Sequence, residues 1–364
     1  MRYAVIIAGG SGTRLWPMSR SGLPKQLIPF IEGKSLLRLA LDRFQGLIPS
    51  ERCYVCAGRQ HQQAICAAAP SLAPAQFIGE PIGRDTLNAV GLSAAVLAQR
   101  DPAAVIGVFT ADHLIEPVGE FQRIVDQGFE LVERMPHSLV TFGIAPTGPV
   151  TAYGYLELGP PIDAAARVVR RFREKPPPAT AADYFQQGPD RYLWNSGMFV
   201  WRAQTLLDCI RRYEPAAWEG LTAVARAWDT PERDAVLDRL FPSLKKISVD
   251  FAVMEPASQD AAVQVAAIPM RLRWLDVGSW PAFAETCPHD AQGNALAAPR
   301  HELQESSDCL VVSSDPQHLV ALIGCQDLIV VHSGSATLVC RADMAEKIKD
   351  LQKRVDARFG GQYT

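Results

Sequence analysis

The chain has 364 residues, of which 48% are hydrophobic and 21% charged, and its formal net charge at pH 7 is −3. This balance excludes general nucleic-acid binding, because there is no basic run to neutralise phosphates. No apolar stretch reaches the roughly 20 residues that span a bilayer, and the apolar core of "MRYAVIIAGGSG" is too short for a signal peptide. We therefore expect a cytoplasmic protein of two domains whose eight scattered cysteines stay reduced.

The first hydrophobic run, residues 3–8, predicts a buried strand that leads directly into the glycine-rich turn "AGGSGTR". Glycines have no Cβ and let backbone N–H groups approach phosphate oxygens closely. Two known motifs do not fit, because Leu15 stands at the third glycine of the dinucleotide fingerprint and Ile28 at the first glycine of a P-loop. We interpret the turn as another kind of phosphate loop, completed by the cations Arg14 and Lys25. The alternative is an ordinary turn with solvated cations.

Strand-like and helical patterns alternate over the next hundred residues. We predict helices over 35–47, 59–69, 86–101 and 121–135, and further strands over 52–58, 75–81, 103–113 and 139–146. Such alternation predicts an α/β fold with a mainly parallel sheet. Ligands of these folds bind at the carboxyl ends of strands, so we expect the glycine-rich turn and "TADH" to face one crevice.

Two carboxylates stand at places where burial without a partner is costly. Asp112 follows the apolar run "VIGVF", and it is either a helix N-cap or a Mg²⁺ ligand. Asp276 in "WLDVGSW" either caps the next helix or is the second carboxylate of that metal site. We expect His113 to be a structural hydrogen-bonding residue, because one histidine makes no metal site.

Polar residues also stand at the ends of two later strands. Glu174 and Lys175 precede the break made by three prolines, and Asn195 begins the strand "WNSGMFVW". Carboxylate and amide groups together suit a polyol, whose hydroxyls need acceptors and donors. The alternative is turn chemistry, since N-S-G is also a turn signal.

The C-terminal part has a different pattern. From about residue 290, short apolar strands begin about nine to ten residues apart, which predicts a small all-β coil or meander packed on the main domain. An amphipathic helix follows, with Met344, Ile348, Leu351 and Val355 on one face. We predict a catalytic domain over 1–285 and a small domain over 286–364.

Taken in order, the motifs "GGSGTRLWPMSR", "PKQL", "GRDT", "TADH", "YGYLEL", "FREKP", "WNSGMFVW", "SVDFAVMEP" and "LDVGSW" resemble those of nucleotide-sugar pyrophosphorylases. The chain is most similar to the bacterial mannose-1-phosphate guanylyltransferases in the short, monofunctional form. The resemblance covers about residues 1–285, and "LVALIGCQDLIVVHSGSATLVC" resembles the family's left-handed β-helical tail. It implies a Rossmann-like nucleotidyltransferase domain with a mainly parallel mixed sheet, a small β-helix-like domain and a terminal helix.

The resemblance also implies a role for each matching residue. The residues implied to hold the nucleotide are Gly9, Gly10, Gly12, Thr13, Arg14, Arg84 and Thr86. Those implied to hold the mannosyl ring and its phosphate are Gly154, Glu174, Asn195 and Lys175. Asp112 and Asp276 are implied to bind Mg²⁺, while Lys25 and Arg14 neutralise phosphate charge during catalysis.

The implied reaction transfers GMP from GTP to mannose 1-phosphate by in-line attack on the α-phosphorus, giving GDP-mannose and pyrophosphate, and we expect a homodimer. The chain departs from the family at Val150 and Ala152, and after Arg84 at Asp85, Leu87 and Asn88. These departures leave the base and the sugar open. The alternatives are another sugar-1-phosphate nucleotidyltransferase and a catalytically silent nucleotide-sugar sensor, although a sensor has no use for the retained lysine and carboxylates.

Overall fold

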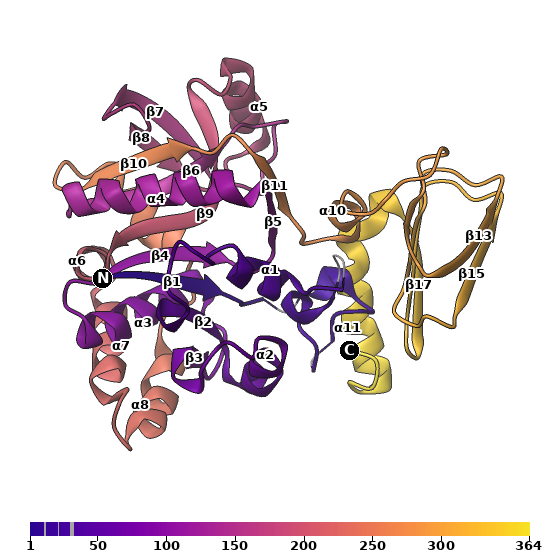
Figure 1. The fold of residues 1–364 in the computed structure, drawn as a ribbon, viewed down its shortest axis with the longest axis horizontal. Helices are drawn as coiled ribbons and strands as arrows, with labels where there is room; N and C mark the ends of the chain where they lie inside the picture. Colours follow the sequence, from indigo (N-terminus) through magenta and orange to yellow (C-terminus); the bar gives the residue numbers. More distant parts are fainter. Residues whose placement is uncertain (11, 21, 30–32) are drawn as a thin grey trace. The chain divides into compact units, whose positions relative to one another are not determined.

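The computed structural model describes residues 1–10, 12–20, 22–29 and 33–364, which form two compact units (Figure 1). Unit 1 comprises Met1–Gly9, Ala40–Ala111 and Ile115–Trp274, and unit 2 comprises Gly10–Leu39, Asp112–Leu114 and Leu275–Thr364. This division differs from the boundary predicted at 285/286. The glycine-rich loop and the short stretch at Asp112 pack with the C-terminal part of the chain, although they are distant from it in sequence.

Unit 1 is built on a nine-stranded sheet. Its strands are β1 (Arg2–Ile7), β2 (Cys53–Gly58), β3 (Phe77–Glu80), β4 (Val105–Thr110), β6 (Ser138–Ile144), β7 (Tyr155–Pro161), β8 (Arg167–Arg173), β9 (Tyr192–Arg202) and β10 (Gln264–Pro269). They lie in the order β3-β2-β1-β4-β9-β6-β10-β8-β7. Pairing is parallel from β3 to β4 and between β6 and β10, and antiparallel at the other neighbours. The Rossmann-like α/β fold is confirmed, with a mixed sheet.

Helices cover both faces of this sheet. They are α2 (Gln62–Ala68), α3 (Asp85–Arg100), α4 (Val118–Arg134), α5 (Pro178–Gln187), α6 (Ala203–Tyr213), α7 (Pro215–Ala227), α8 (Arg233–Leu240) and the single turn α9 (Glu255–Ala257), and α1 (Leu36–Asp42) has residues in each unit. Figure 1 shows α4 on one side of the sheet and α3 with α7 on the other. Alternate residues of β9 face the two layers. A Cβ on Gly128 of α4 would lie 3.4 Å from Val200, while Phe199 and Trp201 join the core cluster that contains α3 residues.

Strand β9 carries an irregularity beside the predicted sugar-binding residues. Its Phe199 pairs with Thr141 of β6, but its Asn195 pairs with Gly143, so extra residues of β9 bulge out of the ladder. Gly197 lies in this bulge with φ +70°, a conformation that favours glycine. Bulges re-aim side chains next to functional sites, and this one turns the Asn195 amide toward the Thr141 hydroxyl.

The C-terminal part of unit 2 is a β-coil, as predicted. Its strands are β12 (Ala295–Ala297), β13 (Arg300–Gln304), β14 (Leu310–Ser313), β15 (Leu319–Ile323), β16 (Leu328–Ser333) and β17 (Ala336–Arg341). Parallel ladders join β12, β14 and β16, and separately β13 and β15, before β17 turns back antiparallel to β16. A chain that returns to the same ladder after each circuit forms the stacked coils of a β-helix.

The core of unit 2 explains why the glycine-rich loop belongs to it. Leu15 and Trp16, which follow the loop, are buried in one cluster with Trp280 of α10 (Trp280–Ala284), with apolar residues of the coil and with Ile348 of α11 (Ile348–Phe359). The indole N–H of Trp280 donates to the Trp16 carbonyl at 3.0 Å, and the indole N–H of Trp16 donates to the Tyr363 carbonyl at 2.7 Å. The loop is therefore fastened to the C-terminal segment.

The terminal helix differs in part from its prediction. Residues Ala342–Lys347 form a 3₁₀ turn, and the α-helix begins only at Ile348. Ile348 is buried, but Met344 and Leu351 are exposed, so the predicted apolar face is only partly covered within one chain. Within the described residues, no helix has the length and apolar character to cross a membrane.

Candidate active site

The glycine-rich loop follows β1, and two of its glycines have left-handed backbone conformations. Gly10 and Gly12 have φ values of +93° and +60°. A Cβ on Gly12 would lie 2.8 Å from the Cβ of Lys25, so only glycine lets the loop pack directly on this lysine. The Gly12 carbonyl accepts hydrogen bonds from the Leu15 N–H and the Ser19 hydroxyl, which hold the turn closed.

Lys25 is buried and paired with a carboxylate. It begins a 3₁₀ turn, Lys25–Leu27, directly after Pro24, and only 8% of the residue is exposed. Its Nζ lies 2.5 Å from Oδ2 of Asp112. Burial by itself would raise the pKa of the Asp112 carboxyl, but the charges of Lys25 and His113 more than offset this and hold that pKa below its usual value. Asp112 is therefore an ionised carboxylate at neutral pH.

A second carboxylate joins Asp112. Strands β5 (His113–Glu116) and β11 (Arg273–Asp276) pair with each other, and the Val277 N–H donates to the Asp112 carbonyl at 3.0 Å. As a result, one ligand atom from each of Asp112, His113 and Asp276 lies within 4.8 Å of the others. Two carboxylates offer the oxygen ligands that Mg²⁺ prefers, so these residues fit the predicted metal.

The structure excludes one of the two alternatives left open for each aspartate. Neither caps a helix: α4 is preceded by Pro117, and the N-cap of α10 is Ser279, whose Oγ accepts from the Ala282 N–H. The capping interpretations are therefore wrong for Asp112 and Asp276. Their role as Mg²⁺ ligands stays a prediction.

Arg14 lies at the edge of this cluster. Its Nη1 pairs with Glu346 of the C-terminal 3₁₀ turn at 3.1 Å, and its side chain is 43% exposed. A Cβ on Gly278 would be 3.1 Å from Oδ1 of Asp276 and 3.6 Å from Nη2 of Arg14, so these two groups flank the same glycine. Most of the predicted nucleotide-binding and metal-binding residues near the loop belong to unit 2: Gly10, Gly12, Thr13, Arg14, Lys25, Asp112 and Asp276. Gly9 instead ends the first segment of unit 1.

The predicted sugar-binding residues gather in unit 1. Nζ of Lys175 lies 2.6 Å from Oε1 of the buried Glu174. A Cβ on Gly154 would lie 2.5 Å from Oε2 of Glu174, so glycine is needed for this carboxylate to fit. The Asn195 N–H donates to the Gly154 carbonyl at 2.8 Å. Four residues from three separate motifs therefore form one polar cluster, and their role in sugar binding stays a prediction.

Asp250 belongs to this cluster and was missed by the sequence analysis. It begins a π-helical turn, Asp250–Met254, and its Oδ1 accepts from Nδ2 of Asn195 at 2.9 Å, while Oδ1 of Asn195 accepts from the Thr141 hydroxyl at 2.8 Å. Burial, and then the negative charge of Glu174, raise the pKa of Asp250 to about 7. Asp250 lies in the motif "SVDFAVMEP", but no feature of the neighbouring sequence distinguishes this aspartate as a site residue.

Arg84 and Thr86, which are predicted to hold the guanine, lie at the start of α3 and form hydrogen bonds within the protein. The Arg84 guanidinium donates to the Pro242 carbonyl, and the Thr86 hydroxyl accepts from the Val249 N–H at 2.9 Å. Both side chains thus brace the 242–249 segment, and their contact with a base stays a prediction. Of the departures from the family, Leu87 and Asn88 are completely buried, so these two positions are part of the core of unit 1.

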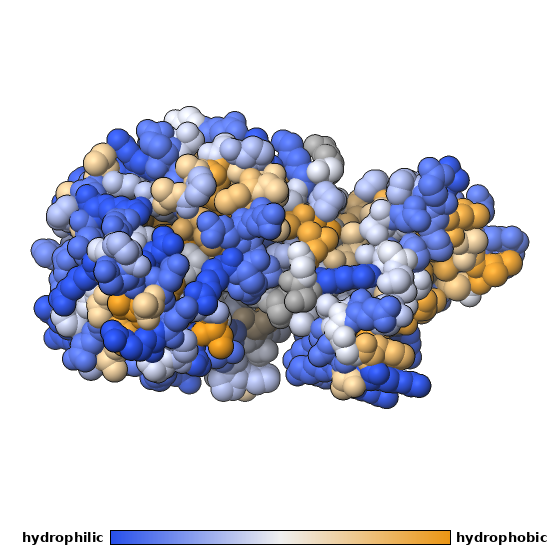
Figure 2. Space-filling view, turned by 90° about the horizontal axis from the view of Figure 1, so that it is seen from below, coloured by the Kyte–Doolittle hydropathy of each residue, from blue (hydrophilic) through white to orange (hydrophobic). Residues whose placement is uncertain are grey.

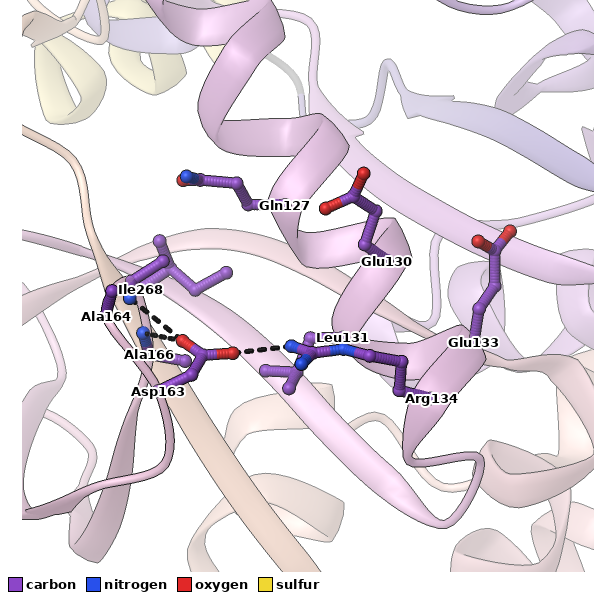
Figure 3. Close-up of a pocket in the computed structure, with 10 residues that line it drawn as sticks. Gln127, Glu130, Leu131, Glu133, Arg134, Asp163, Ala164, Ala166 and Ile268 are labelled. Carbon is purple, nitrogen blue, oxygen red and sulfur yellow. Dashed lines mark hydrogen bonds and ion pairs between the residues drawn. The ribbon is translucent and has the colours of Figure 1, made fainter.

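A cavity of about 460 Å³ lies elsewhere in unit 1, between α4 and the turn after β7. Figure 3 shows Arg134 pointing to Asp163, whose carboxylate accepts from this guanidinium and from the N–H groups of Ala165 and Ala166. Glu133 on its rim is paired with Arg2. None of the predicted site residues lines this cavity, and its Glu133, Arg134 and Asp163 side chains are used in internal ion pairs.

Comparison with known proteins shows similarity over nearly the whole chain. The nucleotidyl transferase family model matches residues 3–293, and the MannoseP isomerase/GMP-like beta-helix domain matches 300–355. The xanthan biosynthesis protein XanB of Xanthomonas campestris is 34% identical over 99% of this chain and 74% of its own length. The mannose-1-phosphate guanylyltransferase RfbM of Salmonella typhimurium is 35% identical over 97% of this chain and 72% of its own length.

A solved structure extends this similarity to three dimensions. The mannose-1-phosphate geranyltransferase from Thermus thermophilus is 33% identical, with a TM-score of 0.84 over 98% of this chain and 99% of that one. The match therefore covers both the sheet domain and the β-coil.

Proposed function

The chain belongs to the nucleotidyl transferase family, and we infer that it is a mannose-1-phosphate guanylyltransferase, which transfers GMP from GTP to mannose 1-phosphate. The observation that carries this function is sequence similarity over nearly the whole chain to proteins of that name, 35% to RfbM and 33% to a relative in Escherichia coli. The retained loop, lysine and carboxylates support catalysis over the silent-sensor alternative.

The reaction needs charge neutralisation more than it needs a base. A sugar phosphate has a second pKa of about 6 and is largely dianionic at neutral pH, so it is already a nucleophile. Its attack on the α-phosphorus of GTP brings two anions together, and this repulsion must be offset by fixed positive groups and by in-line placement. Pyrophosphate then leaves, and GDP-mannose remains.

We propose that unit 2 supplies the positive groups. The N–H groups of the glycine-rich loop and the Arg14 guanidinium would bind phosphate oxygens, and the Lys25 ammonium would stabilise charge that develops during transfer. Asp112 and Asp276 would hold Mg²⁺, which supplies positive charge to the triphosphate when bound. An ionised Asp112 beside a second carboxylate supports this assignment.

We propose that the polar cluster of unit 1 binds the mannosyl phosphate. Glu174 and Asn195 offer an acceptor and an amide for sugar hydroxyls, and Lys175 offers its ammonium to the phosphate. The Lys175 side chain is about half exposed, whereas that of Glu174 is 5% exposed. This contrast suits a solvent-facing ammonium that is accessible to a phosphate, beside a buried carboxylate that accepts from sugar hydroxyls.

The expected homodimer is likewise a proposal. Leu319, Ile323 and Val339 of the β-coil are each more than half exposed, and Figure 2 shows apolar surface over these C-terminal strands. Apolar surface of this kind is typical of association surfaces. Light scattering coupled to size exclusion measures the mass of the particle, and a monomer at micromolar concentration would contradict the dimer.

Activity with a panel of substrates tests the function. Purified protein is incubated with each of the four NTPs and with mannose, glucose and N-acetylglucosamine 1-phosphates, and pyrophosphate release is followed with Mg²⁺ present. We expect the highest kcat/KM for GTP with mannose 1-phosphate. A higher kcat/KM with another base or sugar would show a different specificity within the family. If no substrate pair gives pyrophosphate release, the proposal that the chain is a catalytically active enzyme is contradicted.

A further inference from the structure

The Lys25 ammonium is paired with Asp112, one of the two carboxylates proposed to bind the metal. Its ammonium lies 2.5 Å from Oδ2 of Asp112, and His113 Nε2 lies 3.7 Å from Oδ1 of the same carboxylate. Lys25 is 8% exposed, and the Gly12 backbone packs on the base of its side chain. The lysine is therefore held against Asp112 by the packing of the loop as well as by charge.

The same carboxylate belongs to the cluster that fits a divalent ion, together with His113 and Asp276. Mg²⁺ binds its oxygen ligands at about 2.0–2.1 Å. The two carboxylates, Asp112 and Asp276, carry two negative charges and do not neutralise the three positive charges of an ammonium and a divalent cation together. The two cations repel each other strongly at such distances when they are partly buried. Metal binding at Asp112 must therefore displace Lys25 or be weakened by its proximity.

From this geometry, and resting on the proposed metal site, we propose that Lys25 and the divalent cation compete for Asp112 until a triphosphate accepts the lysine. Phosphate oxygens give the ammonium a new partner, which frees Asp112 for the metal. The loop thus makes the metal bind weakly to the empty protein and tightly together with the nucleotide. Because coupling between sites is reciprocal, the metal also raises the affinity for the nucleotide.

Direct metal binding without nucleotide tests the competition. Mn²⁺ replaces Mg²⁺ as the probe, and free Mn²⁺ is measured by electron paramagnetic resonance for the wild type, for Lys25→Met and for Lys349→Met. Lys349 is an exposed lysine of α11 in the same unit, so its variant controls for the loss of one positive charge. We expect Lys25→Met to bind Mn²⁺ about 10-fold tighter or more, within the roughly 5–150-fold range of such couplings, and Lys349→Met to bind as the wild type does.

The outcomes separate this inference from the metal site itself. Equal Mn²⁺ affinity for the wild type and Lys25→Met would overturn the competition and leave the site standing, provided that Asp276→Asn weakens the binding. If no variant binds Mn²⁺, the proposed site is wrong and the competition falls with it.

A second measurement uses only the wild type, so it does not depend on the folding of a variant. Trace acetylation followed by peptide mass spectrometry compares the reactivity of Lys25 with that of Lys349, with and without Mn²⁺. A displaced Lys25 should become several-fold more reactive relative to Lys349 as Mn²⁺ is added. An unchanged or lower ratio over the range in which Mn²⁺ binds would overturn the competition.

Discussion

Replacing Asp250 with asparagine should stabilise the protein at pH 8. The carboxyl lies in the polar cluster of unit 1, and burial followed by the charge of Glu174 raises its pKa from 3.8 to about 7. A raised pKa means that the folded state binds a proton more tightly than the unfolded state does. Asp250 therefore costs nothing below about pH 4, lowers the free energy of unfolding progressively as the pH rises from about 4 to about 7, and exerts its full penalty above that.

The magnitude follows from the size of the shift. About three pKa units at about 1.4 kcal/mol each set an upper bound of about 4 kcal/mol at pH 8. The carboxyl also interacts with Lys175, which opposes the shift, and accepts a hydrogen bond from Asn195. Since the substituted amide would keep an oxygen for that bond and carry no charge, we expect a gain of about 2–4 kcal/mol. For a domain of 150–250 residues, at about 2–4 °C per kcal/mol, this corresponds to roughly 4–16 °C in Tm.

Thermal unfolding at pH 5 and at pH 8 measures the effect. The gain of Asp250→Asn should be less than half as large at pH 5 as at pH 8. Asp183→Asn is the matched control, because Asp183 is an exposed aspartate of α5 in the same unit and should change Tm little at either pH. A destabilised Asp250→Asn at pH 8, or a gain that is equal at the two pH values, would refute the reasoning.

The remaining predictions concern unit 2. Asp112→Asn and Asp276→Asn should each abolish most activity and raise the Mg²⁺ concentration needed for the remainder, and normal activity in both would end the metal hypothesis. Lys25→Ala should lower kcat by roughly 100-fold or more, with a smaller effect on GTP affinity; an unchanged kcat with a raised KM would show a role in binding only. Deleting residues 290–364 should cause aggregation, because it uncovers the apolar residues that follow the glycine-rich loop; a well-folded, active product in gel filtration and assay would contradict this.

Much of unit 1 follows from local sequence. The strands and helices up to β6 are marked by periodicity and by glycine or proline at their ends, which depend on residues close in the chain. The positive φ values of Gly10 and Gly12 are also favoured locally, because glycine adopts them without strain, whereas the close packing of Gly12 on Lys25 is a tertiary contact. The mixed character of the sheet was not predictable from local sequence. Strand β9 lies antiparallel between β4 and β6, and which strands pair depends on residues that are far apart in the chain.

The candidate site shows the same contrast. The ordered motifs by themselves determined the nucleotidyltransferase class and pointed to Lys25, Asp112, Asp276, Glu174 and Asn195, because those residue types at strand ends suit phosphate, metal and sugar chemistry. Only the tertiary structure decided that the loop packs with the C-terminal segment, that Lys25 is paired with Asp112, and that Asp250 joins Asn195. A side chain's partner and the pKa that follows from it depend on groups far apart in the chain, and nothing in the residues next to it encodes their distance.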